Sequence, residues 1–365
     1  MSSTSRRDFL KRASALAAGA LGAGAFIGCG KQTETKPSTT AGPAKGTQPP
    51  ADAEAKPAGP DLVVVKGGET PTEVVRKALE LLGGMGAFVS AGKSVCIKPN
   101  ASWDRAPGSG GNVHPDVLSE VVKACKEAGA REVIAVDYTL ATAPLDFNGL
   151  RDAAEKAGGK FVELTKDDAD LFDEVEFVPG MKALPEIRPR ELERVASDVM
   201  RADVVINIPV LKTHSATGLA LSLKNLMGVI YNRTRYHGAG SGEGTAVATR
   251  KSQILDHAIA DLGLLLKDKI ALTIVDATYV MRSSDGPRGL DEEDGDPMMS
   301  IVAGRDMVAC DTKAAMLFGM TKEQIGEKVP HIPFAEAIGV GTMDLASLNV
   351  KEVSLGGADK MTAPS

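Results

Sequence analysis

Residues Asn207–Gly228 have the sequence NIPVLKTHSATGLALSLKNLMG and continue a largely apolar run, Ala202–Ile208. The run is too short for a helix and predicts a buried strand. Two lysines, a histidine and an amide follow it, in a span that ends in a helical pattern: Lys212, His214, Lys224 and Asn225. Such residues just beyond a buried strand are typical of a site that binds an anionic or metal-bound ligand.

Outward from this stretch, short apolar runs alternate with amphipathic helical patterns. Strands are predicted at 62–66, 94–98, 131–137, 160–164, 270–275, 299–303 and 351–355, and helices at 70–82, 115–128, 149–157, 249–266, 306–318 and 332–339. This order predicts an α/β fold with a mostly parallel sheet or sheets flanked by helices. We expect one domain over 61–357, with possible α/β lobes at 61–200 and 201–357, and a short tail at 358–365.

Polar residues recur where the predicted strands end. Lys98 and Asn100 follow one strand, Asp137 ends another, and Asp276 ends a third. Because the carboxyl ends of parallel strands meet at one edge of a sheet, we expect these residues to face the segment Asn207–Gly228. The sequence therefore predicts one pocket there for a small-molecule ligand.

Within this pocket, Lys98, Lys212 and Lys224 would hold a phosphate or carboxylate as point charges. The amides of Asn100 and Asn225 would add hydrogen bonds, Asn225 as a donor to an oxyanion. Lys212 and His214 are the candidate catalytic residues, with the histidine as general acid, general base or metal ligand. A solvated loop explains Lys212 equally simply, and an amphipathic helix start explains Lys224.

A metal ion is a possible cofactor, with His114, His214 and Asp276 as the candidate ligands. His114 precedes a proline at a predicted helix start, where a histidine either binds a ligand as a neutral imidazole or caps the helix. Asp137 and Asp276 are either carboxylate ligands, a general base or caps of the following turns. The sequence does not indicate which metal.

Three further charged segments have less specific patterns. The glycine-rich basic loop Tyr231–Gly244 is either a lid over the site or a surface loop. The acidic run over 167–176 predicts a solvated surface, and His257 with Asp261 predicts a pair on a helix surface. His331 has no obvious partner in the sequence.

Several function classes are disfavoured. The phosphate-binding sequence GxxxxGK[ST], the dinucleotide fingerprint GxGxxG after a strand, GxSxG and HExxH are all absent from the sequence. The net charge of -6 and the lack of a basic patch with interleaved aromatic residues exclude nucleic acid as an expected partner.

The amino terminus has the features of an export signal. Residues 5–11, SRRDFLK, match the twin-arginine pattern, so the export machinery that recognises this pattern is an expected partner. The apolar run Ala13–Ile27 is short and rich in glycine for a membrane span. It ends in Phe26-Ile27-Gly28-Cys29, which is similar to a lipobox and makes Cys29 the expected lipidation site, although cleavage without lipidation is also open.

We therefore expect a signal at 1–29 and, because residues 30–60 have almost no large apolar side chains, a disordered tether after it. The mature protein would be periplasmic, or anchored to a membrane and facing away from the cytoplasm. Proteins exported by the twin-arginine route are already folded, and cofactor loading is one common reason for its use. The route therefore favours a bound cofactor.

The remaining cysteines, Cys96, Cys125 and Cys310, are widely spaced. Cys96 and Cys125 fall on apolar faces and are predicted to be small core residues. An iron–sulfur cluster is disfavoured, because clusters usually need four cysteines in a tight run.

The motifs together resemble the family known as domain of unknown function 362. The resemblance rests on Lys98-Pro99-Asn100, the run Asn207–His214, Leu223-Lys224-Asn225 with Gly228, the turn Gly286–Gly289 after Asp276, and DMVACD at Asp306–Asp311. It covers about 61–357 and implies an α/β fold. Many members of the family carry a ferredoxin-like cluster region, whose cysteines this chain lacks. The layout also has an analogy with nickel-pincer lactate racemases, which use lysine and histidine around a metal cofactor.

Two hypotheses for the function remain. In the first, the protein is an exported enzyme or redox-associated protein with a bound metal or anionic cofactor. In the second, it is a lipid-anchored binding protein that captures an anionic small molecule without reacting it. The lysines matter in both hypotheses, whereas the histidines matter only in the first.

Overall fold

The computed structural model describes residues 59–140, 148–176, 192–231, 233, 245–283 and 295–356. The predicted signal, the lipidation site Cys29, the tether up to residue 58 and the predicted tail lie outside the described residues. So does the glycine-rich loop, except for Tyr231 and Arg233. No helix in the described part of the chain is long and apolar enough to cross a membrane.

The described strands are β1 (Leu62–Lys66), β2 (Ser94–Pro99), β3 (Glu132–Tyr138), β4 (Lys160–Leu164), β5 (Phe172–Glu176), β6 (Leu192–Ala196), β7 (Val204–Ile208), β8 (Val210–His214), β9 (Gly218–Ala220), β10 (Ile270–Met281), β11 (Asp296–Gly304) and β12 (Val350–Ser354). Ten of them form one sheet, in the order β12-β1-β11-β10-β7-β2-β3-β4, with β8 beside β10 and β9 beside β8. β5 and β6 form a separate antiparallel pair.

The described helices are α2 (Pro71–Leu81), α3 (Pro115–Glu127), α4 (Leu150–Lys156), α5 (Ser197–Arg201), α6 (Ser222–Asn225), α8 (Thr245–Leu266), α9 (Met307–Phe318), α10 (Lys322–Lys328) and α11 (His331–Ala337). Short 3-10 turns lie at Met85–Ala87, Ala169–Leu171, Leu226–Val229 and Leu345–Ser347. Thr70 and Asp306 cap α2 and α9 with their side chains.

The large sheet is mostly parallel and has helices on both faces, which confirms the predicted α/β fold class. The strands from β10 through β7, β2 and β3 to β4 are parallel neighbours, whereas β11 is antiparallel to both β10 and β1. Alternate residues of a strand point to opposite faces. Leu62 and Val64 of β1 accordingly pack into one core, and Val63 and Val65 pack into the other.

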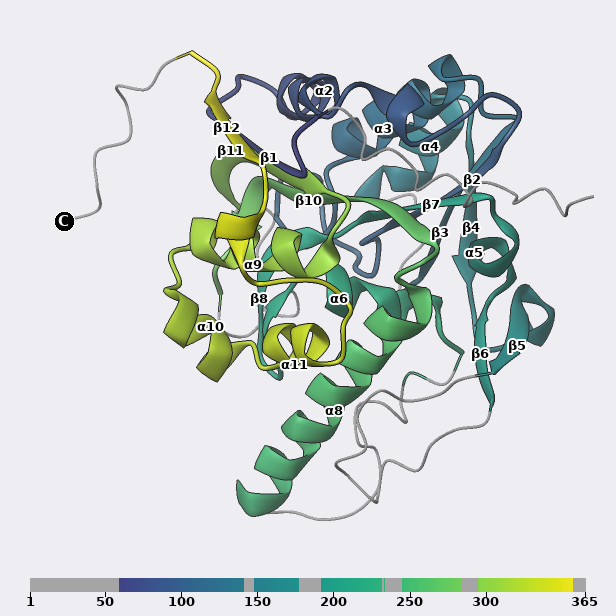
Figure 1. Ribbon diagram of the computed structural model, residues 1–365. Coiled ribbons are helices and arrows are strands. Elements are labelled where there is room, and N and C mark those ends of the chain that lie inside the picture. The colour runs from purple at the N-terminus through teal and green to yellow at the C-terminus, as the bar shows by residue number, and fades with distance from the viewer. Residues whose placement is uncertain are drawn as a thin grey trace, which may run out of the picture. The chain divides into compact units, whose positions relative to one another are not determined.

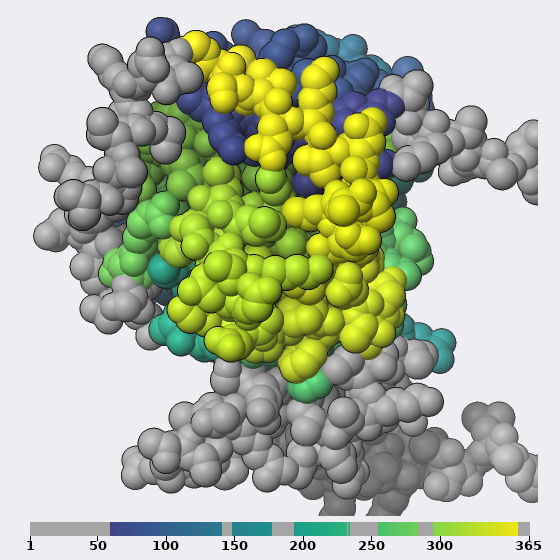
Figure 2. All heavy atoms as spheres, turned by 60° about the vertical axis from the view of Figure 1, so that its left-hand side comes forward, coloured from purple at the N-terminus to yellow at the C-terminus, as the bar shows by residue number. Residues whose placement is uncertain are grey.

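One face of the sheet is covered by α2, α3 and α4, and the other by α5, α6, α8 and α9 (Figure 1). Figure 2 shows the carboxyl-terminal residues as a continuous band over one side of the molecule. Cys96, Cys125 and Cys310 are buried free thiols, and the prediction that Cys96 and Cys125 are core residues is confirmed.

The strand order reverses between β2 and β7. From β2 the chain proceeds through β3 to β4 on one side, then returns so that β7 lies on the other side of β2. The last two residues of each strand are in register, Lys98 opposite Asn207 and Pro99 opposite Ile208. In open α/β sheets, such a reversal leaves a crevice at the carboxyl ends of the strands, and this is where ligands bind.

The structure excludes the solvated loop that the sequence leaves open for Lys212, because Lys212 and His214 lie on strand β8, which pairs with β10. Pro209 interrupts the apolar pattern at the end of β7, but the backbone stays extended beyond it.

The prediction that His257 and Asp261 form a pair on a helix surface is wrong. Both are buried, with 9% and 2% of their surfaces exposed, because α11 packs over α8 and His257 stacks on Phe334. His331 does have a partner, since its Nδ1 lies 2.9 Å from Oδ1 of Asp256.

Candidate functional site

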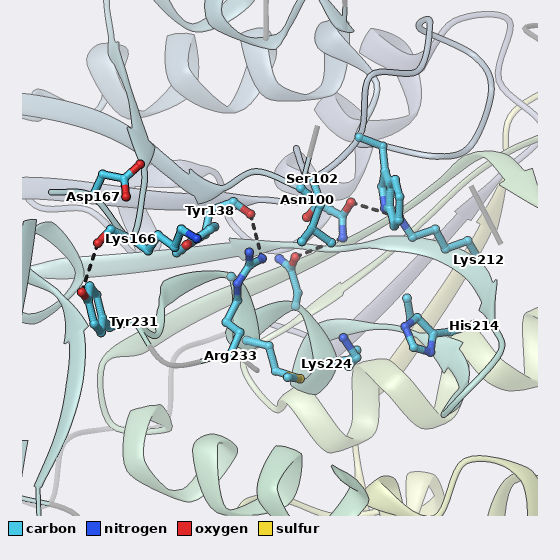
Figure 3. A pocket seen from close by; sticks show the side chains of 16 residues that line it. Asn100, Ser102, Tyr138, Lys166, Asp167, Lys212, His214, Lys224, Tyr231 and Arg233 are labelled. Carbon is cyan, nitrogen blue, oxygen red and sulfur yellow. Dashed lines mark hydrogen bonds between the residues drawn. The ribbon is translucent and has the colours of Figure 1, made fainter. Parts of the chain in front are cut away.

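A cavity of about 420 Å³ lies beyond the carboxyl ends of β2 and β3, against β8 and α6 (Figure 3). Five of the predicted site residues line it: Asn100, Lys212, His214, Lys224 and Asn225. Arg233 joins them from the segment after Tyr231, and Trp103, Tyr138 and Tyr231 add aromatic surface. The structure thus brings the two lysines, the histidine and the two amides together, as the position of the strand ends predicts.

Lys98 lies behind the cavity wall, where protein groups satisfy its ammonium. The group lies 2.8 Å from Oδ1 of Asp137 and donates to the Pro99 carbonyl (2.7 Å) and to Oδ1 of Asn225 (3.1 Å). Both charged side chains are buried, with 1% and 0% exposed. Burial lowers the pKa of Lys98, and the carboxylate of Asp137 opposes this shift. Lys98 therefore serves as a structural ion pair rather than as an open ligand-binding group.

Asn225 joins the ends of three elements. Its Nδ2 donates to the Lys98 carbonyl (3.0 Å) and to Oδ1 of Asn207 (2.8 Å), and its Oδ1 accepts from Lys98 Nζ. Asn207 in turn donates to the Ser222 carbonyl at the start of α6 (3.0 Å). These bonds fasten α6 to the ends of β2 and β7. Both hydrogen-bonding ends of the Asn225 amide have protein partners.

Gly228 packs directly against the ion pair. A Cβ atom at this position would lie 2.2 Å from Oδ1 of Asp137 and 2.8 Å from Nζ of Lys98. No side chain larger than hydrogen fits while the pair is intact, which explains the glycine three residues after Asn225.

Lys212 reaches the cavity from β8 and has only 2% of its surface exposed. Its Nζ donates to Oδ1 of Asn100 (3.1 Å) and to the Gly111 carbonyl. Burial lowers the pKa of this amine to about 7, and the positive charge of Lys224 contributes to the same shift.

Lys224 and Arg233 bring further positive charge to the cavity. Nζ of Lys224 has no hydrogen-bond or ion-pair partner among the described residues, and burial followed by the charge of Arg233 lowers its pKa to about 8. Arg233 donates to the Tyr138 carbonyl (3.2 Å), and its guanidinium lies 3.5 Å from the centre of the Tyr138 ring. In Figure 3, Lys212, His214 and Lys224 occupy one end of the cavity, and Lys166, Asp167 and Tyr231 occupy the other.

The His214 imidazole is oriented by its own turn. Its Nδ1 accepts from the Ala216 backbone N–H (3.2 Å) and lies 3.0 Å from Oγ1 of Thr217. Because Nδ1 is an acceptor, the neutral ring carries its proton on Nε2.

His114 and Asp276 do not line the cavity. His114 caps α3, with Nδ1 accepting from the Asp116 N–H (3.2 Å), and stacks on Tyr279. The carboxylate of Asp276 is buried and accepts from the backbone N–H of His114 (2.7 Å) and from the Thr278 hydroxyl (2.6 Å). Burial raises its pKa.

His214 lines the cavity whereas His114 and Asp276 do not, so the structure does not bring the three proposed metal ligands together. In the described ranges, no three His, Cys, Asp or Glu side chains are grouped in a way that could hold one.

Asp311 positions the helix that carries Lys224. Its carboxylate on α9 accepts from the backbone N–H groups of Ser222 (2.7 Å) and Leu223 (3.0 Å) and from the Ser222 hydroxyl (2.5 Å). Burial raises the pKa of this carboxyl to about 6. In the sequence, Asp311 is notable only as part of the motif DMVACD. Its contact with α6 cannot be predicted, because the two segments lie far apart along the chain.

The sequence does not single out Trp103 and Tyr138, and it includes Tyr231 only as the first residue of the glycine-rich basic loop. Arg233 was noted only as part of the glycine-rich loop. Its charge beside a predicted anion site was the one available signal.

The fold and the cavity define an α/β protein with a cationic pocket at the reversal of its strand order. The chain belongs to the family described as domain of unknown function (DUF362), which matches residues 95–316.

One curated relative is thylakoid-associated protein sll1697 of Synechocystis sp., which is 34% identical over 156 residues, 43% of this chain and 45% of that protein. The chain therefore matches less than half the length of this relative.

Two solved structures are distantly similar. A Thermotoga maritima protein has 14% identity and a TM-score of 0.42, over 68% of this chain and 58% of that chain. The lactate racemase apoprotein of Thermoanaerobacterium thermosaccharolyticum has 12% identity and a TM-score of 0.40, over 70% and 56%. At these scores, the similarities carry no argument about function.

Proposed function

We propose that the strand-end cavity binds a small organic anion, one that carries a carboxylate or a phosphate. The observation that carries this proposal is the imbalance of charge around the cavity. Four cationic side chains lie in or behind its wall, Lys98, Lys212, Lys224 and Arg233, whereas Asp137 is the carboxylate that acts on them.

Lys98 already neutralises Asp137, so the positive charge of Lys224 and Arg233, and of Lys212 while its amine is protonated, is left without a balancing carboxylate. Burying charges of one sign is costly unless they are compensated. A bound anion supplies that compensation, and it also gives the Lys224 ammonium the acceptor that it lacks among the described residues. Lys166 and Asp167 at the outer end are exposed and carry opposite charges, so they leave the balance unchanged.

The size and lining of the cavity favour an organic anion over an inorganic ion. A volume of about 420 Å³ lies in the range of small-molecule pockets. Trp103, Tyr138 and Tyr231 provide aromatic surface for a carbon skeleton, and the cations of the cavity fix its charged group.

The location of the protein is the second part of the proposal. The SRRDFLK sequence at 5–11 and Cys29 support export by the twin-arginine route and a lipid anchor, with 30–60 as the tether. The name of the Synechocystis relative associates that protein with thylakoids, which supports a membrane setting for this chain as well. The described domain would then present its cavity outside the cytoplasm.

Isothermal titration of the purified protein with phosphate, succinate and pyruvate tests the binding site. Lys224→Met should weaken the best of these ligands by about tenfold or more, since one charge-assisted contact is lost. Lys156→Met is the matched control, because it removes an exposed lysine that pairs with Asp152 on α4. Equal affinities in the Lys224 and Lys156 variants would overturn the assignment of the cavity.

A further inference from the structure

Lys212 and Lys98 are both buried lysines, but their surroundings differ. Three acceptors surround Nζ of Lys98, and one of them is the carboxylate of Asp137. Nζ of Lys212 has two acceptors among the described residues, Oδ1 of Asn100 and the Gly111 carbonyl, and both are uncharged. Three acceptors with a counter-charge suit an ammonium, whereas two neutral acceptors suit the two N–H bonds of a neutral amine.

A neutral amine held in this way keeps its lone pair free. Lys212 lines the cavity, so a ligand in the cavity has access to the third position on Nζ. Nearby, Lys224 and Arg233 supply the charge that an anionic ligand needs. The site therefore combines a fixed nucleophile with cationic groups that position a carboxylate.

We propose that Lys212 forms an imine with the carbonyl carbon of a 2-oxo acid whose carboxylate is bound by Lys224 and Arg233. This inference rests on the proposed anion-binding function and names its ligand class and its chemistry. It assigns Lys212 as a catalytic residue.

The step balances without an added oxidant or reductant. The Lys212 lone pair attacks the carbonyl carbon, and the C=O π electrons move onto oxygen to give a carbinolamine after proton transfer. The carbinolamine then loses its hydroxyl group and the remaining N–H proton as water, which leaves C=N. Protonation of the imine nitrogen from solvent gives the iminium ion.

The ionisation of the lysine agrees with this role. Burial and the neighbouring charge of Lys224 lower the pKa of Lys212 to about 7, so a large part of the amine is neutral near pH 7. An exposed lysine, with a pKa of about 10.4, is neutral in roughly one molecule per thousand at that pH. Lys212 should therefore react selectively.

The test is reductive trapping in the purified protein at pH 7. Pyruvate or 2-oxoglutarate is added with cyanoborohydride, and the product is examined by intact mass and by peptide mapping. We expect one reduced adduct on Lys212, in at least about tenfold greater yield than on any exposed lysine. Lactate, which has a hydroxyl group in place of the keto group and so forms no imine, serves as the ligand control.

Lys212→Arg removes the nucleophile. Arginine is protonated at this pH and forms no imine under these conditions, so this variant should give no adduct at position 212. Should the variant fail to fold, the peptide map of the unaltered protein alone decides where the adduct lies.

The outcomes are distinguishable. Pyruvate or 2-oxoglutarate that binds without a Lys212 adduct would overturn the imine but leave the anion site standing. Binding of phosphate or succinate without either oxo acid would overturn the ligand class. A protein that binds none of these anions would overturn the proposed function itself.

Discussion

At Gly228 a hydrogen atom stands where any other residue would place a Cβ, and the Lys98–Asp137 ion pair fills that space. A buried ion pair contributes little net stability by itself, but separating its partners leaves charges uncompensated in the interior. The pair also anchors Asn225, and through it the end of β7. The absence of a side chain at Gly228 therefore leaves room both for the Lys98–Asp137 ion pair and for the cavity wall that this pair anchors.

Gly228→Ala should lower the free energy of unfolding by about 3–5 kcal/mol, the cost of disrupting a buried ion pair. Chemical denaturation measures the change. Gly326→Ala in α10 is the matched control: that glycine is exposed, and an added Cβ meets nothing within 4 Å. It should be neutral or stabilising by up to about 1 kcal/mol, from helix propensity. Equal effects of the two changes would contradict the role of Gly228.

Lys224 gives the anion site a pH dependence. Its pKa in the ligand-free protein is about 8, and a bound anion favours the ammonium form. The free protein loses this proton as the pH rises through about 8, so binding above that pH requires proton uptake and the affinity falls. For a carboxylate ligand that stays ionised throughout, we expect a decrease of up to about tenfold per pH unit above pH 8.

Titration calorimetry in buffers of different ionisation enthalpy measures this proton uptake directly. Lys224→Arg is the informative variant, because arginine stays charged over this range and should flatten the pH profile. A profile equally steep in the Lys224→Arg variant would assign the titration to another group.

For single residues, the sequence predicts which residue types lie at the site but not which role each of them has. Lys98, Lys212 and Lys224 are equivalent as strand-end or helix-end lysines. Only the tertiary neighbours show that Lys98 forms an ion pair with Asp137, while Lys224 has no hydrogen-bond or ion-pair partner in the part of the chain that the structure describes. His257 illustrates the same limit, because the helix α11 that buries it lies far along the chain.

Among the elements, α6 depends most on its surroundings. It has four residues, fewer than a helix needs to be stable alone. Asp311 of α9 satisfies the backbone N–H groups of Ser222 and Leu223, and Asn207 of β7 binds the Ser222 carbonyl. The position of Lys224 is therefore fixed by residues that do not touch the cavity.

Asp311→Asn should loosen α6 and weaken anion binding by about tenfold, together with a loss of roughly 1.5–3 kcal/mol of stability per charge-assisted hydrogen bond removed. Hydrogen exchange at Ser222 and Leu223, with binding measured by titration, follows both effects.

Asp306→Asn is the control on the same helix: Asp306 binds the N–H groups of Ala309 and Thr342 and not α6. It should cost stability without altering affinity, and an unchanged affinity in the Asp311 variant would refute the positioning role.

The elements also show where sequence patterns are reliable. Strands and helices with clear periodicity, such as β1 and β4, lie where the sequence predicts them. β8 and β9 do not follow this rule. β9 has only three residues, and β8 follows a proline and contains Lys212 and His214, so the extended conformation of β8 comes from pairing with β10 and β9 rather than from its own pattern.

For the molecule as a whole, the strand order explains why the site could be located before its contacts were known. Alternating strands and helices imply a parallel sheet, and the polar residues at its strand ends imply a shared edge. The order itself was not predictable, because the pairing of β1 with β12 and the return of β7 to β2 join distant parts of the chain. The reversal that creates the cavity lies in these long-range pairings.

The same long-range pairings bear on export. A sheet built from distant strands folds slowly, because loop closure must precede its contacts. Its three described cysteines are buried free thiols, and burial raises the pKa of each, to about 12 for Cys125, so none of the three depends on an oxidising compartment. Folding before the proposed export would suit both properties.

Changing both Arg6 and Arg7 to lysine should therefore block export while leaving a folded precursor in the cytoplasm. Cell fractionation with limited proteolysis measures this: the variant should remain cytoplasmic with a protease-resistant core, whereas the unaltered protein should reach the outside of the cytoplasmic membrane. Arg12→Lys, the same substitution just beyond the pair, should export normally. If the double variant is exported as well as the Arg12 variant, the twin-arginine assignment is wrong. If its precursor is degraded without a resistant core, folding does not precede export.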